Sequence, residues 1–417
     1  MRTRRRVIPV IGLVFFLLAC QSLGDTTPLA TGGGITSTAP TSGQVAATDP
    51  SYPPDDGSRI SVQIATPGQD TKTGFINRFG EVVIAPSFEW AGYFADNLAP
   101  VRIAENKNGY IDRQGNIVIQ PVFTSARPFS EGAAFVSAID ANGTPNYGFI
   151  DIYGNYLIGP IEGEWPFATQ DGSDSFSSSE KHYGEILFYD GFVVTNMTGN
   201  ITYSGNYMNK NGDFMFEDDR LVWAHRFSEG LAVVQMRDGT IENPNTGYTA
   251  VIDITGKEIF RFDGHCPHYY SEGLLACGSY DTTVLGFIDR SGNMVIPATY
   301  DNALPFSEGL AAVEKDDQWG YIDTAGNLVI PFQFSDARPF MDGVALVDTG
   351  SGDMASVLNP SRGYINKAGE FVYSSFFGIG FDFNEGLAHI IQESTDGTPD
   401  MEGYIDSNGK LVFQVNE

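Results

Sequence analysis

The sequence predicts an all-β fold built as a tandem array, and three observations lead to this prediction. A phrase of roughly 35–45 residues recurs nine times between Ser61 and the C-terminus, which is typical of stacked repeats. The composition, with 48 glycines and 13% aromatic residues, suits short strands joined by frequent turns. No apolar stripe with the 3.6-residue spacing of a helix runs for long anywhere in the chain.

Every copy of the repeat contains an Asx-x-x-Gly turn. An Asx side chain accepts hydrogen bonds from backbone amides two or three residues on, and glycine supplies the positive φ that closes the turn. Asn replaces Asp in three of the nine copies, which indicates a short acceptor rather than a charge. The nine pairs are Asn77/Gly80, Asp112/Gly115, Asp151/Gly154, Asn209/Gly212, Asp253/Gly256, Asp289/Gly292, Asp323/Gly326, Asn366/Gly369 and Asp406/Gly409.

Three short apolar segments make up each unit. In the clearest copy they lie at residues 310–313, 320–323 and 327–330. The first two flank a polar hairpin loop, and the second and third flank the Asx turn. We therefore expect nine three-stranded antiparallel meanders, arranged as a β-propeller-like ring or as an open β-repeat spiral.

A second pattern connects the units and reads aromatic, spacer, acid, glycine. Asn97 takes the place of the glycine in the first copy, as a left-handed turn position allows. We expect the aromatic ring to pack between neighbouring sheets and the acid to accept hydrogen bonds from turn amides. The eight copies lie at residues 94–97, 129–132, 188–191, 227–230, 270–273, 306–309, 340–343 and 383–386.

These two patterns carry a family resemblance. Trp319-Gly-Tyr-Ile-Asp-x-x-Gly-x-Leu-Val-Ile-Pro, together with Phe306-Ser-Glu-Gly-Leu-Ala-Ala-Val, resembles the bacterial WG-repeat (KWG) family over about residues 60–413. The resemblance implies a β-rich interaction module, common in exported or surface proteins, without known catalytic residues. Only Trp319 keeps the family's tryptophan, which argues against a repeated tryptophan-based ligand site. The residues before Gly74, Gly109, Gly148, Gly286, Gly363 and Gly403 are Thr, Asn, Tyr, Leu, Arg and Glu.

The N-terminus predicts export and a lipid anchor. Four arginines precede an apolar stretch at residues 7–19, which is short for a membrane span and typical of a signal peptide. Leu17-Leu18-Ala19-Cys20 then resembles a bacterial lipoprotein box, so we expect lipidation, with palmitate among the acyl chains, at Cys20. Residues 20–56 form a flexible Thr/Ser/Gly/Pro-rich linker, and the repeat domain is expected at residues 57–417. The alternative is an ordinary signal peptide that happens to end in cysteine.

The charge of the chain narrows the class of partner. The formal net charge is −28, and cleavage after residue 19 would leave 20 basic and 52 acidic residues, or −32. Such a surface repels nucleic acid and anionic lipid headgroups. We expect an extracytoplasmic protein that is anchored to a bacterial membrane and binds a protein or an envelope polysaccharide.

Two places break the repeat. One is the insertion at residues 161–202, where Trp165, Asp171, Asp174 and Glu180 suggest a projecting binding loop. The acids do not follow the spacing of a calcium loop, and a solvated loop without a ligand is the alternative.

The other place holds two cysteines, Cys266 and Cys277. In an exported chain whose Cys20 carries lipid they are left as a pair, which favours a disulfide over free buried thiols. His265 and His268 flank Cys266, but a metal site would need a fourth ligand, so we expect neither a metal nor a cofactor.

Known catalytic motifs are absent from the sequence, including a nucleophile elbow, a His-Glu-x-x-His zinc motif and a phosphate loop. We therefore expect a binding scaffold that is not an enzyme. A carbohydrate-active hydrolase using two of the 52 acids is one alternative, and a purely structural surface spacer is another.

Overall fold

The computed structural model describes residues 56–65, 70–162, 186–197, 204–216, 221–237, 247–350, 361–392 and 401–415. These residues belong to one compact unit, Asp55–Glu417. They form strands, turns and bends, and none of them lies in a helix. Accordingly, the described part of the chain contains no helix that could cross a membrane.

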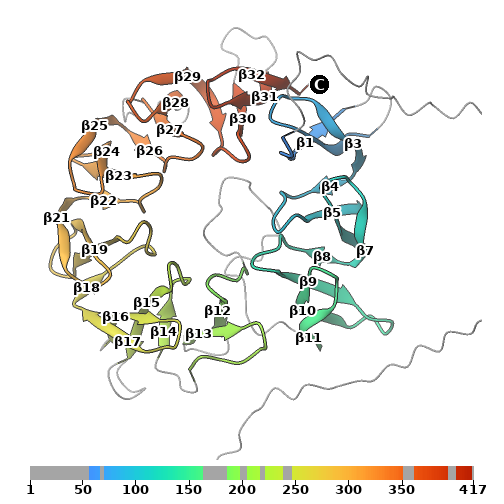
Figure 1. The fold of residues 1–417 in the computed structure, drawn as a ribbon, viewed down its shortest axis with the longest axis horizontal. Coiled ribbons are helices and arrows are strands. Elements are labelled where there is room, and N and C mark those ends of the chain that lie inside the picture. The colour runs from blue at the N-terminus through green and yellow to red at the C-terminus, as the bar shows by residue number, and fades with distance from the viewer. Residues whose placement is uncertain are drawn as a thin grey trace, which may run out of the picture. The chain divides into compact units, whose positions relative to one another are not determined.

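Antiparallel strands form nine blades, which we number in chain order (Figure 1). Blade 1 consists of β1 (Ile60–Ile64), β2 (Lys72–Ile76) and β3 (Val82–Phe88). Blade 2 consists of β4 (Trp90–Ala91), β5 (Ala99–Ala104), β6 (Lys107–Ile111) and β7 (Ile117–Phe123). Blade 3 consists of β8 (Ser125–Ala126), β9 (Ala133–Ile139), β10 (Pro145–Asp151) and β11 (Tyr156–Glu162). Blade 4 consists of β12 (Phe192–Met197) and β13 (Ser204–Asn209).

The remaining blades repeat this order. Blade 5 consists of β14 (Leu221–Ala224), β15 (Leu231–Arg237), β16 (Gly247–Asp253) and β17 (Glu258–Phe262). Blade 6 consists of β18 (Gly264–His265), β19 (Leu275–Ser279), β20 (Leu285–Ile288) and β21 (Met294–Tyr300). Blade 7 consists of β22 (Asn302–Ala303), β23 (Leu310–Lys315), β24 (Gln318–Asp323) and β25 (Leu328–Phe334). Blade 8 consists of β26 (Asp336–Ala337), β27 (Val344–Asp348), β28 (Ser361–Asn366) and β29 (Phe371–Gly380), and blade 9 of the end of β29 with β30 (Leu387–Gln392), β31 (Met401–Asp406) and β32 (Leu411–Gln414).

The predicted three-stranded meander is confirmed, and the structure adds a short strand in front of it. In blade 7 the order across the sheet is β22, β23, β24, β25, and only the last three are long. The short strand is two residues in most blades, so it leaves no alternation of apolar and polar residues for the sequence to show. The two-residue strands β4, β8, β18, β22 and β26 each begin two residues after the last long strand of the preceding blade ends, which ties these consecutive blades together.

The Asx turns form as predicted, with a slightly different reach. Oδ1 of Asp323 accepts hydrogen bonds from the amides of Ala325 at 3.0 Å and Asn327 at 2.8 Å, which lie two and four residues on. The predicted positive φ at the turn glycines is confirmed, with 83° at Gly326 and 77° at Gly409. A left-handed φ of this size is unstrained only for glycine.

Close packing gives these glycines a second role. A Cβ atom on Gly326 would lie 3.2 Å from Cγ2 of Ile296 in blade 6, and one on Gly409 would lie 2.0 Å from the carbonyl oxygen of Val372 in blade 8. These two Asx turns therefore rest on the last long strand of the preceding blade.

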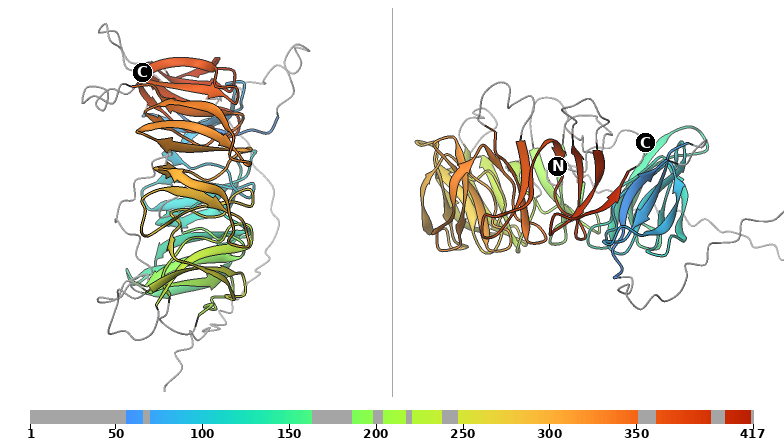
Figure 2. Two further views of the ribbon diagram at one scale, coloured as in Figure 1. Left: turned by 90° about the vertical axis from the view of Figure 1, so that its left-hand side faces the viewer. Right: turned by 90° about the horizontal axis from the view of Figure 1, so that it is seen from above.

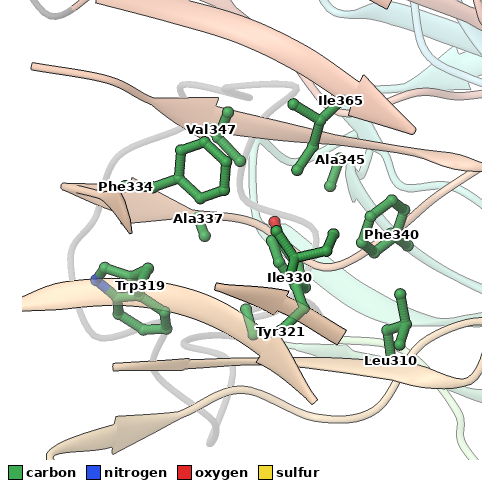
Figure 3. Close-up of a cluster of buried hydrophobic side chains, with 11 residues drawn as sticks. Leu310, Trp319, Tyr321, Ile330, Phe334, Ala337, Phe340, Ala345, Val347 and Ile365 are labelled. Atoms are coloured by element: carbon green, nitrogen blue, oxygen red, sulfur yellow. The ribbon is translucent and has the colours of Figure 1, made fainter. Parts of the chain in front are cut away.

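The apolar core is divided into nine clusters, and each cluster joins two consecutive blades. Figure 3 shows the cluster between blades 7 and 8, where Trp319 and Phe334 meet Ala337 and Val347. The ninth cluster joins Ile60 and the other core residues of blade 1 to blade 9. The blades therefore close into a ring, which decides between the two arrangements that the sequence left open (Figures 1 and 2).

Closure uses side-chain contacts rather than a shared strand. The hydroxyl group of Tyr404 in blade 9 donates a hydrogen bond to the carbonyl oxygen of Ser61 in β1 at 3.2 Å. The corresponding tyrosine of blade 7, Tyr321, donates to the carbonyl of Arg338 at 2.9 Å, just after the short strand of blade 8. The seam thus uses the same tyrosine as an ordinary interface, with an acceptor on the first long strand of blade 1.

Candidate functional site

The aromatic-x-acid-glycine segments form two-residue turns with positive φ at both central residues. Glu308 has a φ of 54° and Gly309 a φ of 87°, while Ser307 and Leu310 exchange two backbone hydrogen bonds across the turn. Glycine accepts this geometry freely, but glutamate is strained by it. A strained residue that recurs at this position indicates that its side chain is held by a specific contact.

That contact is a hydrogen bond to the next blade. The carboxylate of Glu308 accepts from the amide of Gly343 at 3.1 Å, and the carboxylate of Glu272 accepts from the amide of Gly309 at 3.0 Å. In blade 9 the carboxylate of Glu385 instead accepts from the amide of Arg59 and pairs with Arg113 at 2.8 Å. The same link joins Asp96 to Gly132, Glu131 to Gly191, Asp190 to Gly230, Glu229 to Gly273 and Asp342 to Gly386. These repeated acids are therefore part of the scaffold.

A different part of each blade varies in chemistry from copy to copy. We define the cross-blade row as the residue of the short strand and the three residues opposite it on the long strands. In blade 7 the row is Asn302, Glu314, Trp319 and Phe334. Trp319 and Phe334 pack against core residues of blade 8, so the row faces the following blade.

The rows of other blades carry different side chains at the same places. The tryptophan that names the repeat pattern is present in the row of blade 7 and is replaced by Asn108, Tyr147, Thr249 or Arg362 elsewhere. Asn108, Tyr147 and Arg362 stand directly before a repeat glycine and are visible in the sequence, whereas Thr249 precedes Ala250. Placing any of them beside the short-strand residue requires the strand register. The rows are Trp90, Arg102, Asn108 and Phe123 in blade 2; Ser125, Ser137, Tyr147 and Ile161 in blade 3; Trp223, Gln235, Thr249 and Phe262 in blade 5; and Asp336, Asp348, Arg362 and Phe376 in blade 8.

Three residues of the row of blade 8, Asp336, Asp348 and Arg362, line a cavity of about 140 Å³. Phe381 and Asp382 of the chain leading into blade 9 line it as well. Burial raises the pKa of Asp336, while the neighbouring guanidinium groups of Arg338 and Arg362 act in the opposite direction. A small cavity with mixed charge suits a polar group that both donates and accepts hydrogen bonds.

The row of blade 5 faces blade 6 with an exposed indole. Trp223 is 42% exposed, and its ring lies 4.0 Å from the imidazole ring of His225. Thr249 Oγ1 donates to the carbonyl of Gly264 at 2.6 Å and lies 3.0 Å from the hydroxyl of Tyr280, which is 54% exposed. Two partly exposed aromatic rings are therefore fixed in position near this interface.

His225 is held neutral at this interface. Burial, aided by the nearby charges of His268 and Arg226 and opposed by the hydrogen bond to Cys266, lowers the pKa of His225 to about 4. Its Nε2 atom lies 3.2 Å from the carbonyl oxygen of Cys266, which identifies Nε2 as the donor in the neutral ring. The imidazole thus acts as a link from blade 5 to blade 6.

Cys266 and Cys277 are joined by a disulfide, with an S–S distance of 2.05 Å. The two cysteines occupy the place that an Ala–Val pair, such as Ala337 and Val347, takes in other blades. The structure therefore assigns Cys266 to a disulfide rather than to a metal site with His265. No group of three or more metal-ligating side chains occurs within the residues that the structure describes.

The other predicted site residues cannot be placed. The lipidation residue Cys20 and the insertion residues Trp165, Asp171, Asp174 and Glu180 lie outside the described residues. The sequence prediction did not include the rows as a site. An alignment of the repeat copies with one another would have shown how the chemistry of these positions varies.

Comparison with known proteins identifies the repeat. The family described as WG containing repeat matches residues 74–107, 109–138, 286–319 and 319–351. No curated protein matches the chain in sequence.

Solved structures resemble the fold. A crystal structure described as that of the eukaryotic initiation factor has a TM-score of 0.53 at 9% identity and covers 86% of this chain and 97% of that chain. AztD from Citrobacter koseri has a TM-score of 0.38 at 12% identity, covering 77% of this chain and 92% of AztD. The WD40 domain of Toxoplasma gondii coronin has a TM-score of 0.31 at 14% identity, covering 64% and 77%. At these identities the first likeness supports the fold and none indicates a function.

Proposed function

The chain is a WG-repeat protein, and we propose that its ring is a non-catalytic scaffold that binds a protein or an envelope polysaccharide. The turns support this proposal because their acids are used to join blades. The rows support it further, since they vary in charge and aromatic content while the backbone that carries them stays constant. Such a division is expected where binding has to be specific and the fold has to be kept.

The observation that carries the proposal is the contrast between repeated and varied positions. Glu308 and its equivalents accept a hydrogen bond from a glycine amide of the next blade, and Glu385 alone among these turn acids accepts from Arg59 instead. The row residues share a position and differ in chemistry, from the buried Trp319 to the charged Asp336 and Arg362. A purely structural spacer would have no need of such differences.

A partner screen tests the proposal. The full chain is screened against proteins and polysaccharides of the cell envelope, and each ligand is then assayed for turnover. We expect reproducible binding without turnover. Hydrolysis of a glycan would support the carbohydrate-active alternative, and binding to nothing would leave a structural spacer.

Row variants locate the binding. Arg362→Gln changes the cavity between blades 8 and 9, while Arg102→Gln makes the same chemical change in the row of blade 2. A partner that uses the cavity loses affinity only for the first variant. Equal affinity for both variants and the parent would remove the cavity from the proposal.

The same proposal includes export and a lipid anchor at Cys20. The apolar segment before Cys20 and the polar linker after it support this reading. Cys20→Ser is expected to release the protein from the membrane fraction or to leave its precursor uncleaved. A variant that fractionates and migrates like the parent would contradict the anchor.

A further inference from the structure

Arg226 lies in the chain that leads from the short strand of blade 5 to its turn, and two tyrosine rings enclose its guanidinium group. Its Cζ atom lies 4.1 Å from the ring centroid of Tyr189, which precedes blade 4, and 3.8 Å from that of Tyr269, which precedes the turn of blade 6. Stacking on aromatic faces holds a guanidinium in one plane and leaves its N–H groups directed outward along the edge.

One of those N–H groups lacks an acceptor among the described residues. The Nε atom of Arg226 is buried and has no hydrogen-bond partner there. Other arginines in this acidic chain differ, since Arg113 pairs with Glu385 at 2.8 Å and Arg290 with Glu229 at 3.1 Å. A buried donor without a partner is costly, which indicates that an acceptor is supplied from elsewhere.

The surroundings of Arg226 are aromatic and include two imidazole rings. His225 lies close enough to Arg226 and His268 to interact with their charges, and its ring lies 4.0 Å from that of Trp223. Trp223 is 42% exposed, so its apolar face is open to solvent. Within four residues, the chain therefore presents an exposed indole, an imidazole and an arginine.

We propose that Arg226 binds a carboxylate of an acidic saccharide, with the exposed face of Trp223 packing against a sugar ring. The planar guanidinium can donate two parallel hydrogen bonds to one carboxylate, and the indole matches the apolar face of a pyranose. This inference rests on the proposed scaffold function and names the class of ligand.

A saccharide is favoured over an acidic peptide by the exposed aromatic surface. A peptide carboxylate would use Arg226 but would leave the Trp223 face without a matching group. The overall charge of −28 also disfavours a densely charged partner, whereas a short glycan with few uronate groups presents little charge elsewhere.

The test measures binding of the full chain to a galacturonate trimer by calorimetry at low salt, with maltotriose as the neutral sugar and acetylated triglutamate as the acidic peptide. Arg226→Gln and Trp223→Ala are each expected to weaken trimer binding at least tenfold. Arg226→Lys keeps the charge but not the planar fork, so its affinity should lie between those of the parent and Arg226→Gln. Arg261→Gln, at an exposed arginine of the same blade that pairs with Glu258, is the matched control and should bind like the parent.

Several results would overturn the inference. Unchanged trimer affinity in a folded Arg226→Gln protein would exclude Arg226, and equal affinity for maltotriose would exclude the carboxylate. Preference for triglutamate would assign the site to a protein partner. If the trimer does not bind at all while the partner screen finds another ligand, the acidic saccharide is wrong and the scaffold function stands.

Discussion

The interface between blades 7 and 8 and the interface between blades 5 and 6 occupy the same place in the repeat but are filled differently. In blade 7 the row carries its tryptophan on the second long strand, where Trp319 is 7% exposed (Figure 3). In blade 5 the tryptophan is on the short strand, where Trp223 is 42% exposed, and Thr249 takes the place of Trp319.

The two interfaces also differ in the residue pair that the following blade contributes to them. The Ala337–Val347 pair of blade 8 fills the first interface with apolar atoms, whereas the Cys266–Cys277 disulfide occupies that place in blade 6. This disulfide closes a small loop within blade 6, and such a link contributes about 2–4 kcal/mol to stability. The comparison shows that the tryptophan of one interface is buried in the packing, whereas that of the other is partly exposed and available to a ligand.

The largest expected effect is the difference in unfolding free energy between alanine variants of the two tryptophans. Trp319→Ala should lower the free energy of unfolding by about 3–5 kcal/mol, because it leaves a cavity in a close-packed cluster. Trp223→Ala should change it by less than about 1 kcal/mol, since much of the ring is already in water. Denaturant unfolding of both variants gives the two values. Equal losses would mean that the interface between blades 5 and 6 is ordinary scaffold.

The second prediction concerns His225, which belongs to only one of the two interfaces. Burial lowers its folded-state pKa to about 4, below the unfolded value of about 6.5, so the unfolded chain takes up a proton first as the pH falls. Its contribution to stability is therefore complete above about pH 6.5 and is lost between about pH 6.5 and 4, by at most about 3 kcal/mol.

His225→Gln is expected to flatten the dependence of unfolding free energy on pH within that window. Burial also lowers the pKa of His389 in blade 9, so part of the slope should remain. The Asx-turn aspartates, such as Asp323, have lowered pKa values and lose their contribution at a lower pH. An unchanged slope in the variant would show that His225 is not buried as a neutral ring.

The repeat was predictable from the sequence because its turns need particular residues. Gly326 and Asp323 are required by local geometry, and local geometry is written in adjacent residues. The ring and the rows were not predictable in the same way. Closure depends on contacts between Tyr404 and Ser61 at opposite ends of the domain, and a row depends on register across four strands. Both are long-range facts that a single copy of the repeat does not contain.

The third prediction compares two turn glycines, one that packs against blade 5 at the interface between blades 5 and 6 and one with open surroundings. Gly292 and Gly309 both have positive φ, so alanine should cost about 1–2 kcal/mol of strain at either position. A Cβ atom at Gly292 would also lie 2.8 Å from the ring of Phe260 in blade 5, whereas nothing lies within 4 Å at Gly309. Gly292→Ala should therefore lower the unfolding free energy by about 1–3 kcal/mol more than Gly309→Ala. Equal losses would indicate that blade 6 sits more loosely on blade 5 than the structure shows.

The smallest effect distinguishes the two Asx turns that flank the interface between blades 7 and 8. Oδ2 of Asp323 accepts a hydrogen bond from the amide group of Asn327 at 3.0 Å, while the amide group of Asn366 donates to the carboxylate of Glu370 at 3.0 Å. The sequence contains this rule throughout, since the residue four positions after the Asx is Asn or Lys after each Asp and an acid after each Asn.

The rule predicts an asymmetry between two reciprocal substitutions. Asp323→Asn should cost little, because the Asn327 amide can turn to offer its oxygen. Asn366→Asp places two carboxylates together and should lower the unfolding free energy by up to about 1 kcal/mol, a small value because the turn is in contact with solvent. The double variant Asn366→Asp with Glu370→Asn recreates the pair of blade 7 and should recover that loss. Thermal unfolding of the parent, both single variants and the double variant measures these differences. If the double variant is no better than Asn366→Asp alone, the turn is set by the backbone-binding oxygen and the fourth residue plays no part.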